Sequence, residues 1–308
     1  SVKRRGTVQH NRMLFDYILQ YIPYFWLQRL NLLLCCLAAT LAVSSCQKTG
    51  IRQTLEKAGE NRRELETVLE HYKNEPLKEK AARFLLENMD GHFAHTGEAV
   101  DVYDNYMDSV FRHCNGDRVF WIMKYDTILQ RTGLDLELSQ DERLYDAQSV
   151  TADFLTEHID SAFTVWQQNW NKQYSFEMFC RYVLPYRIGN EKTSLWRKTF
   201  TVPSWVREAY APNQDNSTYA YGMANDILGG MRSVIYYPPQ FLPDLPLTAL
   251  EHVKSASCKE YAHLCVAVLR AHGLPATIDF TPQWGNRGLG HEWCVFFPDN
   301  HSFIPFNP

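Results

Sequence analysis

The sequence predicts an α+β protein, in which a mostly helical N-terminal region is followed by a helix packed on an antiparallel sheet. Two patterns predict this class. Apolar residues recur at helical spacing through much of residues 51–183, and the last fifty residues change from helical to alternating periodicity. The chain has 308 residues, 45% of them hydrophobic and 14% aromatic, so it is long enough to bury a large core.

The charge balance argues against a nucleic-acid partner. Lys and Arg together number 31 and Asp and Glu number 35, which gives a formal net charge of -4. Nucleic-acid binding normally rests on a basic surface that neutralises backbone phosphates. We therefore expect no nucleic acid among the partners.

The N-terminal segment, residues 1–46, has the pattern of an export signal. A short apolar run at 30–43 follows Arg29, is too short to span a bilayer comfortably, and ends in the tetrad VSSC at 43–46. This tetrad resembles the lipobox of bacterial lipoproteins, in which the cysteine is lipidated, so we expect lipid attachment at Cys46 and a membrane as partner. An uncleaved anchor and a plain signal peptide are the alternatives. Because the chain starts with Ser1, Met13 is a candidate start, and the residues before it carry no fold argument.

Residues 47–215 are predicted to form a helical domain. Two amphipathic helices are expected within 51–88, separated at Asn74-Glu75-Pro76, because proline restricts the residue before it. Further helical patterns lie at 99–111, 152–168 and 176–183. A polar stretch at 211–217 marks the domain boundary.

The helix at 176–183 must end at Leu184-Pro185, and a loop at 188–197 is expected to follow. This loop contains Glu191, Trp196 and Arg197, which either support the fold or form one wall of a substrate cleft. A helix at 219–228 and a proline-rich turn at 237–239 complete the predicted approach to the C-terminal region.

The next predicted helix starts at or beside Cys258. Ser255 or Ser257 can cap it, and Gly273 with the proline beyond it ends it. A thiol in the first helical turn meets unpaired backbone N–H groups and the positive end of the helix dipole, which favour thiolate over thiol. This is a suitable position for a nucleophile. Cys265 lies on the apolar stripe of the same helix and is expected to be inert.

The other cysteines and the glycines give no cofactor or metal motif. In an exported protein the five cysteines that follow residue 46 would meet an oxidising compartment. No two of them have C-x-x-C spacing, and because five is an odd number at least one thiol has no disulfide partner within the chain. A zinc site built from His263, Cys265, His291 and Cys294 lacks suitable ligand spacing, so no metal is expected. The glycine-rich segment at 285–290 does not follow the dinucleotide pattern, so no cofactor is expected either and the segment is interpreted as a flexible rim.

Two strands near the C-terminus form a predicted hairpin, at 291–297 and 302–307, with a turn at 298–300. This turn would place Phe297 opposite His301 and His291 opposite Asn307. Residues directly opposed on two strands share a face, so Asn307 could orient the His291 imidazole. Asp299 lies in the turn at the far end of the strand, too distant to serve instead.

The C-terminal region contains four blocks in order: a small residue and Cys258 at a helix start, LRAHGLPA at 269–276, GHEW at 290–293 and IPFN at 304–307. Together these blocks resemble the transglutaminase-like core. The helical region also resembles exported lipoproteins of gut Bacteroidota. The resemblance implies a papain-like α+β core at 216–308, with Cys258 as nucleophile and His291 as base. The family usually has Asp where this chain has Asn307, and the chain ends at Pro308, so a core truncated at its C-terminus is considered.

The resemblance implies acyl transfer at a peptide or carboxamide bond of a peptide or protein substrate. We expect hydrolysis through Cys258, His291 and Asn307, with Trp284 and Trp293 beside the substrate. The alternatives are cross-linking to an amine, peptide deglycosylation, and a non-catalytic binding module that keeps the fold.

Overall fold

The computed structural model describes residues 50–113, 142–167, 171, 173–200, 222, 224, 243–252, 257–285, 288 and 290–307. The chain divides into two compact units, Ser1–Arg52 and Gln53–Pro308. The second unit contains all the helices and strands discussed below. The described helices and strands of this unit are η1 Gly59–Asn61, α2 Arg62–His71, α3 Pro76–Glu87, β1 Phe93–His95, α4 Glu98–His113, β2 Arg143–Tyr145, α7 Asp146–Ser149, α8 Ala152–Trp166, α9 Phe176–Tyr182, α10 Trp196–Thr199, η3 Leu247–His252, α13 Cys258–Ala271, β3 Ala276–Thr281, β4 His291–Phe296 and β5 Ile304–Phe306.

The α+β class is confirmed, and the helical part forms largely where the apolar spacing places it. Helices α2 and α3 are separated at Pro76, which takes the first helical turn of α3, where its missing N–H costs nothing. Helix α8 begins after Thr151, whose side chain accepts a hydrogen bond from the backbone N–H of Phe154. Helices α2, α3 and α8 pack on one another through apolar stripes that include the fully buried Leu65 and Ile159. The short β1–β2 ladder lies beside them.

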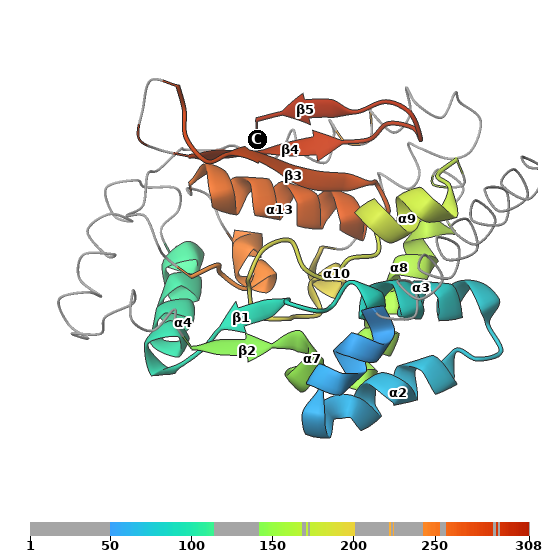
Figure 1. Ribbon diagram of the computed structural model, residues 1–308. Coiled ribbons are helices and arrows are strands. Elements are labelled where there is room, and N and C mark those ends of the chain that lie inside the picture. Colours follow the sequence, from blue (N-terminus) through green and yellow to red (C-terminus); the bar gives the residue numbers. More distant parts are fainter. Residues whose placement is uncertain are drawn as a thin grey trace, which may run out of the picture. The chain divides into compact units, whose positions relative to one another are not determined.

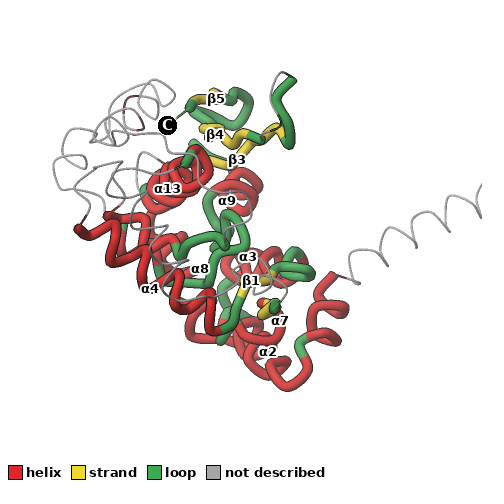
Figure 2. The backbone as a smooth tube through the Cα atoms, turned by 90° about the vertical axis from the view of Figure 1, so that its left-hand side faces the viewer, coloured by secondary structure: helices red, strands yellow, loops and turns green. Residues whose placement is uncertain are grey.

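The C-terminal part packs α13 against a three-stranded antiparallel sheet with the order β3-β4-β5. Figure 1 shows α13 running along one face of this sheet, and the helical part lies on the side of α13 that faces away from the sheet. Figure 2 shows the same order of sheet, α13 and helical part from a second direction. The core between helix and sheet is fully buried; its members include Cys265, Val266, Leu269, Cys294 and Phe296. Cys265 and Cys294 therefore serve as packing groups in this core.

Buried arginines connect α13 to the helical part. Arg270, from the LRAHGLPA block, donates to the carbonyl oxygens of Tyr182, Arg187 and Ala276 at 3.0–3.1 Å. Arg197 of α10 donates to the carbonyl oxygen of Arg270 at 2.6 Å and to that of Val183. Because five N–H groups in a planar fork can satisfy several carbonyls, each arginine ties segments that are distant in sequence.

The segment after α9 supports the fold. Trp196 is fully buried and donates its indole N–H to the carbonyl oxygen of Tyr186 at 2.8 Å. Glu191 is 1% exposed and accepts hydrogen bonds from the backbone N–H groups of Ile188 and Gly189. These contacts favour the supporting role over the cleft wall. The predicted loop is also shorter than expected, because α10 begins at Trp196.

The hairpin register differs from the predicted one by two residues. The prediction paired Phe297 with His301, whereas β4 ends at Phe296, which pairs with Ile304. The connection is longer because Asp299 accepts hydrogen bonds from the backbone N–H groups of His301 and Ser302, which holds them in the turn. An even shift keeps every side chain on its predicted face, because strand side chains alternate with a period of two.

Several predictions fall on residues that are not described. The signal segment 1–46, the polar stretch at 211–217 with the domain boundary at 215, and the turn at 237–239 lie outside the described residues. Of the helix predicted at 219–228, only Gly222 and Ala224 are described, both in helical conformation. Within the described part of the chain, the helices are all too short or too polar to cross a membrane.

Candidate active site

Cys258 is the first residue of α13, as the capping pattern predicts. Ser257 is the N-cap, and Glu260 returns its carboxylate to the backbone N–H of Ser257 at 2.8 Å, completing a capping box. The Cys258 side chain is half-buried, so reagents in solvent can reach it. The positive end of the α13 dipole and the unpaired backbone N–H groups of the first turn lie here.

The other described cysteines have a different environment. Cys180, Cys265 and Cys294 are free thiols like Cys258, but all three are buried. Burial raises the pKa of the Cys180 thiol to about 12, and burial together with the neighbouring Cys265 raises the pKa of the Cys294 thiol well above its usual range. Cys258 is thus the described thiol best placed to act as a nucleophile.

His291 and Asn307 are joined by a hydrogen bond. The distance from His291 Nε2 to Asn307 Oδ1 is 2.8 Å. The bond forms in spite of the two-residue difference in register, because Asn307 stays on the face of His291 and reaches it diagonally from the end of β5. It engages Nε2, so Nδ1 is the ring nitrogen left to exchange a proton with a thiol.

Cys258 and His291 belong to neighbouring elements, but no hydrogen bond joins these two described side chains. The pairing of α13 with β4 brings the start of the strand to the first turns of the helix. Cys294 Sγ lies 3.4 Å from the carbonyl oxygen of Ala262, and Glu292 Oε2 lies 3.4 Å from His263 Nε2. The structure therefore assembles the histidine–amide half of the predicted triad, with the cysteine at the adjoining helix start.

Both predicted aromatic neighbours contact the His291 ring. The ring centroid of His291 lies 5.1 Å from that of Trp284 and 5.8 Å from that of Trp293, and each pair of planes is inclined by 33°. Trp284 comes from the β3–β4 connection and is 44% exposed, so part of its indole surface is open to a bound molecule. An aromatic face near an imidazolium also stabilises its positive charge.

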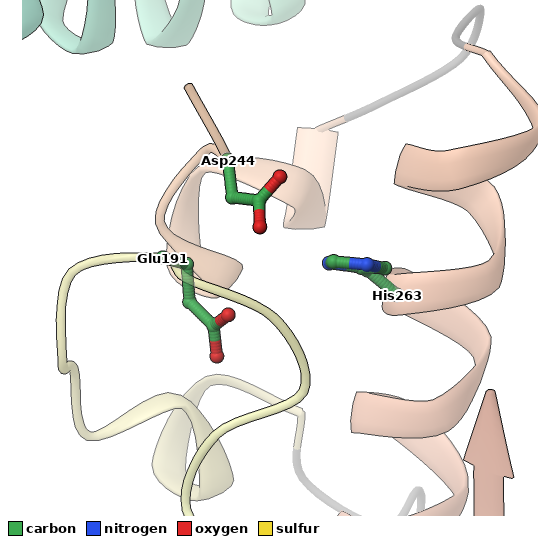
Figure 3. A group of neighbouring side chains, drawn as sticks. All are labelled: Glu191, Asp244 and His263. Atoms are coloured by element: carbon green, nitrogen blue, oxygen red, sulfur yellow. The ribbon is translucent and has the colours of Figure 1, made fainter. Parts of the chain in front are cut away.

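A group of charged side chains that the sequence did not indicate lies beside this site. Glu191, Asp244 and His263 come from three separate segments and converge, as Figure 3 shows, with possible ligand atoms all within 4.8 Å of one another. Lys259 forms an ion pair with Asp244, and Glu292 with His263. We refer to these five residues as the ionic cluster. Long sequence separations hide it, since the spacing rules for motifs apply only within one segment.

The ligand atoms of the ionic cluster already have partners within the chain. Glu191 accepts two backbone N–H groups, Asp244 accepts the N–H of Asn190 at 2.7 Å and pairs with Lys259, and His263 Nε2 faces Glu292. A carboxylate and imidazole set of this kind could hold a divalent cation. Here the Lys259 ammonium supplies the positive charge, so we interpret the cluster as an internal ion-pair network. Among the described residues, His263, Cys265, His291 and Cys294 do not converge as a possible set of metal ligands.

The network stabilises the charged forms of its members. Burial alone would lower the pKa of His263, but the hydrogen bond to Glu292 and the charges of Asp244 and Glu191 outweigh it and raise that pKa. Burial alone would raise the pKa of Asp244, but Lys259 and His263 outweigh it and lower that pKa. The result favours an imidazolium at position 263 between three carboxylates.

Comparison with known families agrees with the geometry. The family model of the transglutaminase-like superfamily matches residues 203–308, the region that holds α13, the three-stranded sheet, Cys258, His291 and Asn307. No curated protein and no solved structure matches the chain. Residues 203–308 are therefore a domain of the transglutaminase-like superfamily, which includes cysteine acyl-transfer enzymes.

Proposed function

We propose that this protein is a cysteine-dependent acyl-transfer enzyme that acts on a peptide or carboxamide bond, with water as the usual acceptor. The observation that carries the proposal is the 2.8 Å hydrogen bond from His291 to Asn307. An imidazole held at one nitrogen, beside a helix that begins with a half-buried cysteine, is the arrangement that cysteine–histidine catalysis requires.

The first half of the reaction forms a thioester. The Cys258 thiolate attacks the carbonyl carbon of the amide, forming a C–S bond, and the developing oxyanion is held by the backbone N–H of Cys258 in the first turn of α13. The His291 imidazolium then gives its proton to the departing nitrogen as the C–N bond breaks. Ammonia or an amine leaves, and the acyl group remains on the sulfur.

The second half releases the acyl group. Water attacks the thioester carbonyl carbon and gives one proton to His291, the C–S bond breaks, and the carboxylic acid leaves. Cys258 and His291 return to the thiolate and imidazolium forms. Asn307 holds the ring orientation throughout, but its neutral amide adds no charge to stabilise the imidazolium, so the indoles of Trp284 and Trp293 are the groups in contact that can do so.

A second candidate is a non-catalytic binding module that keeps the transglutaminase-like fold. One observation favours it: no hydrogen bond joins the described Cys258 and His291 side chains. Nucleophile and base often lie farther apart without substrate than in a reacting complex, so this geometry is also that of a resting enzyme.

The test follows ammonia release from a blocked glutaminylglycine dipeptide, with and without an added primary amine. We expect ammonia and the free acid without the amine, and loss of at least about a thousandfold in rate in Cys258→Ala. Cys265→Ala, a change on the same helix, is the matched control and should retain turnover if folded. Undiminished turnover in Cys258→Ala would refute the proposal. A product that incorporates the amine at the expense of the acid would instead identify a cross-linking enzyme.

A further inference from the structure

The ionic cluster connects the two elements that carry the proposed nucleophile and base. Lys259 follows Cys258 in the sequence, and Glu292 follows His291. Between the two elements, Glu292 Oε2 lies 3.4 Å from His263 Nε2. Lys259 pairs with Asp244, which lies in the segment before η3. We propose that His263 and Glu292 are positioning residues, which hold the Cys258 end of α13 against the His291 end of β4. The inference rests on the proposed function, since it assigns a role in that same site.

Apart from the weak hydrogen bond from Cys294 Sγ to the carbonyl oxygen of Ala262, the core between α13 and the sheet is apolar. Cys265, Val266 and Leu269 of the helix pack on Cys294 and Phe296 of the sheet, and all five are buried. Apolar contacts are not directional and tolerate small sliding motions, whereas an ion pair with a hydrogen bond prefers one relative position. At the site end of the interface, the described ion pair between the two elements is the one from His263 to Glu292. It is therefore the contact that fixes their register near Cys258 and His291.

The loop after α9 restricts His263 from a third side. The backbone N–H groups of Ile188, Gly189 and Asn190 donate to Glu191 and Asp244, which brings the loop down onto the cluster. A Cβ atom added to Gly189 would lie 2.6 Å from His263 Cε1 and 2.5 Å from Asp244 Oδ2. Since His263 is also 5% exposed, its ring has little space to turn away from Glu292.

The charges of the cluster reinforce this arrangement. Three carboxylates face His263: Asp244 from the segment before η3, Glu191 from the loop and Glu292 from β4. Lys259 on α13 supplies one positive charge, and a protonated His263 supplies the second. The histidine is thus held as an imidazolium donor to Glu292, which strengthens the link between helix and strand.

The experiment measures alkylation of Cys258 by iodoacetamide at about pH 6, with peptide mapping to separate it from the buried thiols. We expect folded Glu292→Gln and His263→Gln to react roughly tenfold to a hundredfold more slowly than the wild type, because small displacements of reacting groups have effects of this size. The alkylation rate of the double variant should fall by less than the product of the two single-variant reductions, since two amides can still form a hydrogen bond.

Two further variants separate position from charge and from stability. Glu292→Asp keeps the charge beside His291 but shortens the reach to His263, so positioning predicts slower alkylation and a purely electrostatic role predicts the wild-type rate. His272→Gln removes another buried histidine from the far end of α13 and should leave the alkylation rate within about twofold of wild type. Wild-type rates in folded Glu292→Asp and Glu292→Gln would overturn the inference.

The same assay distinguishes this failure from failure of the proposed function. If wild-type Cys258 reacts no faster than Cys265, the proposed function fails and the positioning role fails with it. If wild-type Cys258 is reactive and the Glu292 variants are equally reactive, only the positioning role is wrong.

Discussion

Asn307 is the residue that departs from the family pattern, and its consequences can be measured. An amide orients His291 by the observed 2.8 Å hydrogen bond but brings no negative charge. A carboxylate at the same position would favour the imidazolium and hence the thiolate of Cys258. Orientation and charge are separable here by substitution.

Asn307→Asp keeps an oxygen acceptor for His291 and adds a carboxylate that favours the ion pair of imidazolium and thiolate over the neutral pair, so Cys258 should react at least as fast as in the wild type near neutral pH. Asn307→Ala removes the hydrogen bond and should slow the reaction by about tenfold or more. Iodoacetamide alkylation rates between about pH 4 and 8 measure both effects. Identical pH profiles for wild type, Asn307→Asp and Asn307→Ala would show that Asn307 does not act on His291.

His263 makes stability depend on pH in a direction that its environment determines. Burial opposes its protonation, but Glu292, Asp244 and Glu191 outweigh burial, so its pKa in the folded state is raised above the unfolded value of about 6.5. A raised pKa means that the stabilisation is complete below the unfolded pKa and is lost as the pH rises through the folded pKa. The groups that face it also include Lys259, which opposes protonation.

The free energy of unfolding of the wild type, minus that of His263→Gln, should therefore decrease as the pH rises above neutrality. His272 offers the opposite control, since burial lowers its pKa and its stabilisation is lost as the pH falls. Urea unfolding across this range measures the difference between each variant and wild type. A wild-type advantage over His263→Gln that grows with pH would contradict the proposed protonation state.

At the scale of elements, local patterns predicted most of the helices and strands. Pro76 starts α3, Ser257 caps α13, and alternation gives β4, because these signals act within a few residues. The register of β4 and β5 was wrong by two residues, since the hydrogen bonds of Asp299 lengthen the turn. The face of Asn307 was nevertheless predicted correctly, and that decides whether it can reach His291.

The ionic cluster could not be predicted in the same way. Its members come from the loop after α9, the segment before η3, α13 and β4, so they meet only once the chain has folded. The same holds for the arginines that connect the helical part to α13. Arg270 is part of the block that resembles the family, yet its three carbonyl partners lie on different segments.

A buried ion pair between Arg187 and Asp146 joins the segment after α9 to α7. Both side chains are almost fully buried, and the hydroxyl of Tyr186 donates to the same Asp146 carboxylate at 2.7 Å. Arg187→Met should lower the free energy of unfolding by about 3–5 kcal/mol, because it leaves the aspartate charge buried without its partner. Chemical denaturation measures this. Arg181→Met, which breaks an exposed pair with Glu177, is the control and should change stability by less than about 1 kcal/mol.

At the scale of the whole molecule, the described compact unit is Gln53–Pro308, and the proposed lipid anchor belongs to the segment before it. We propose that the protein is exported and attached to a bacterial membrane through Cys46, on the VSSC tetrad.

Cys46→Ser should move the protein from the membrane fraction to the soluble fraction after expression in a bacterium that processes lipoproteins. Ser45→Ala leaves the cysteine in place and serves as the control. Fractionation with mass spectrometry of the mature N-terminus measures both location and modification. An unmodified Cys46 in the membrane fraction would contradict lipidation and indicate an uncleaved anchor.

The central claim is that Cys258 is a nucleophile activated by His291, and its alkylation by iodoacetamide tests this most directly. At about pH 6, native wild-type protein should be modified at Cys258 far faster than at Cys265. His291→Gln should abolish that difference without unfolding the protein. A Cys258 that reacts equally slowly in wild type and in His291→Gln would contradict the account.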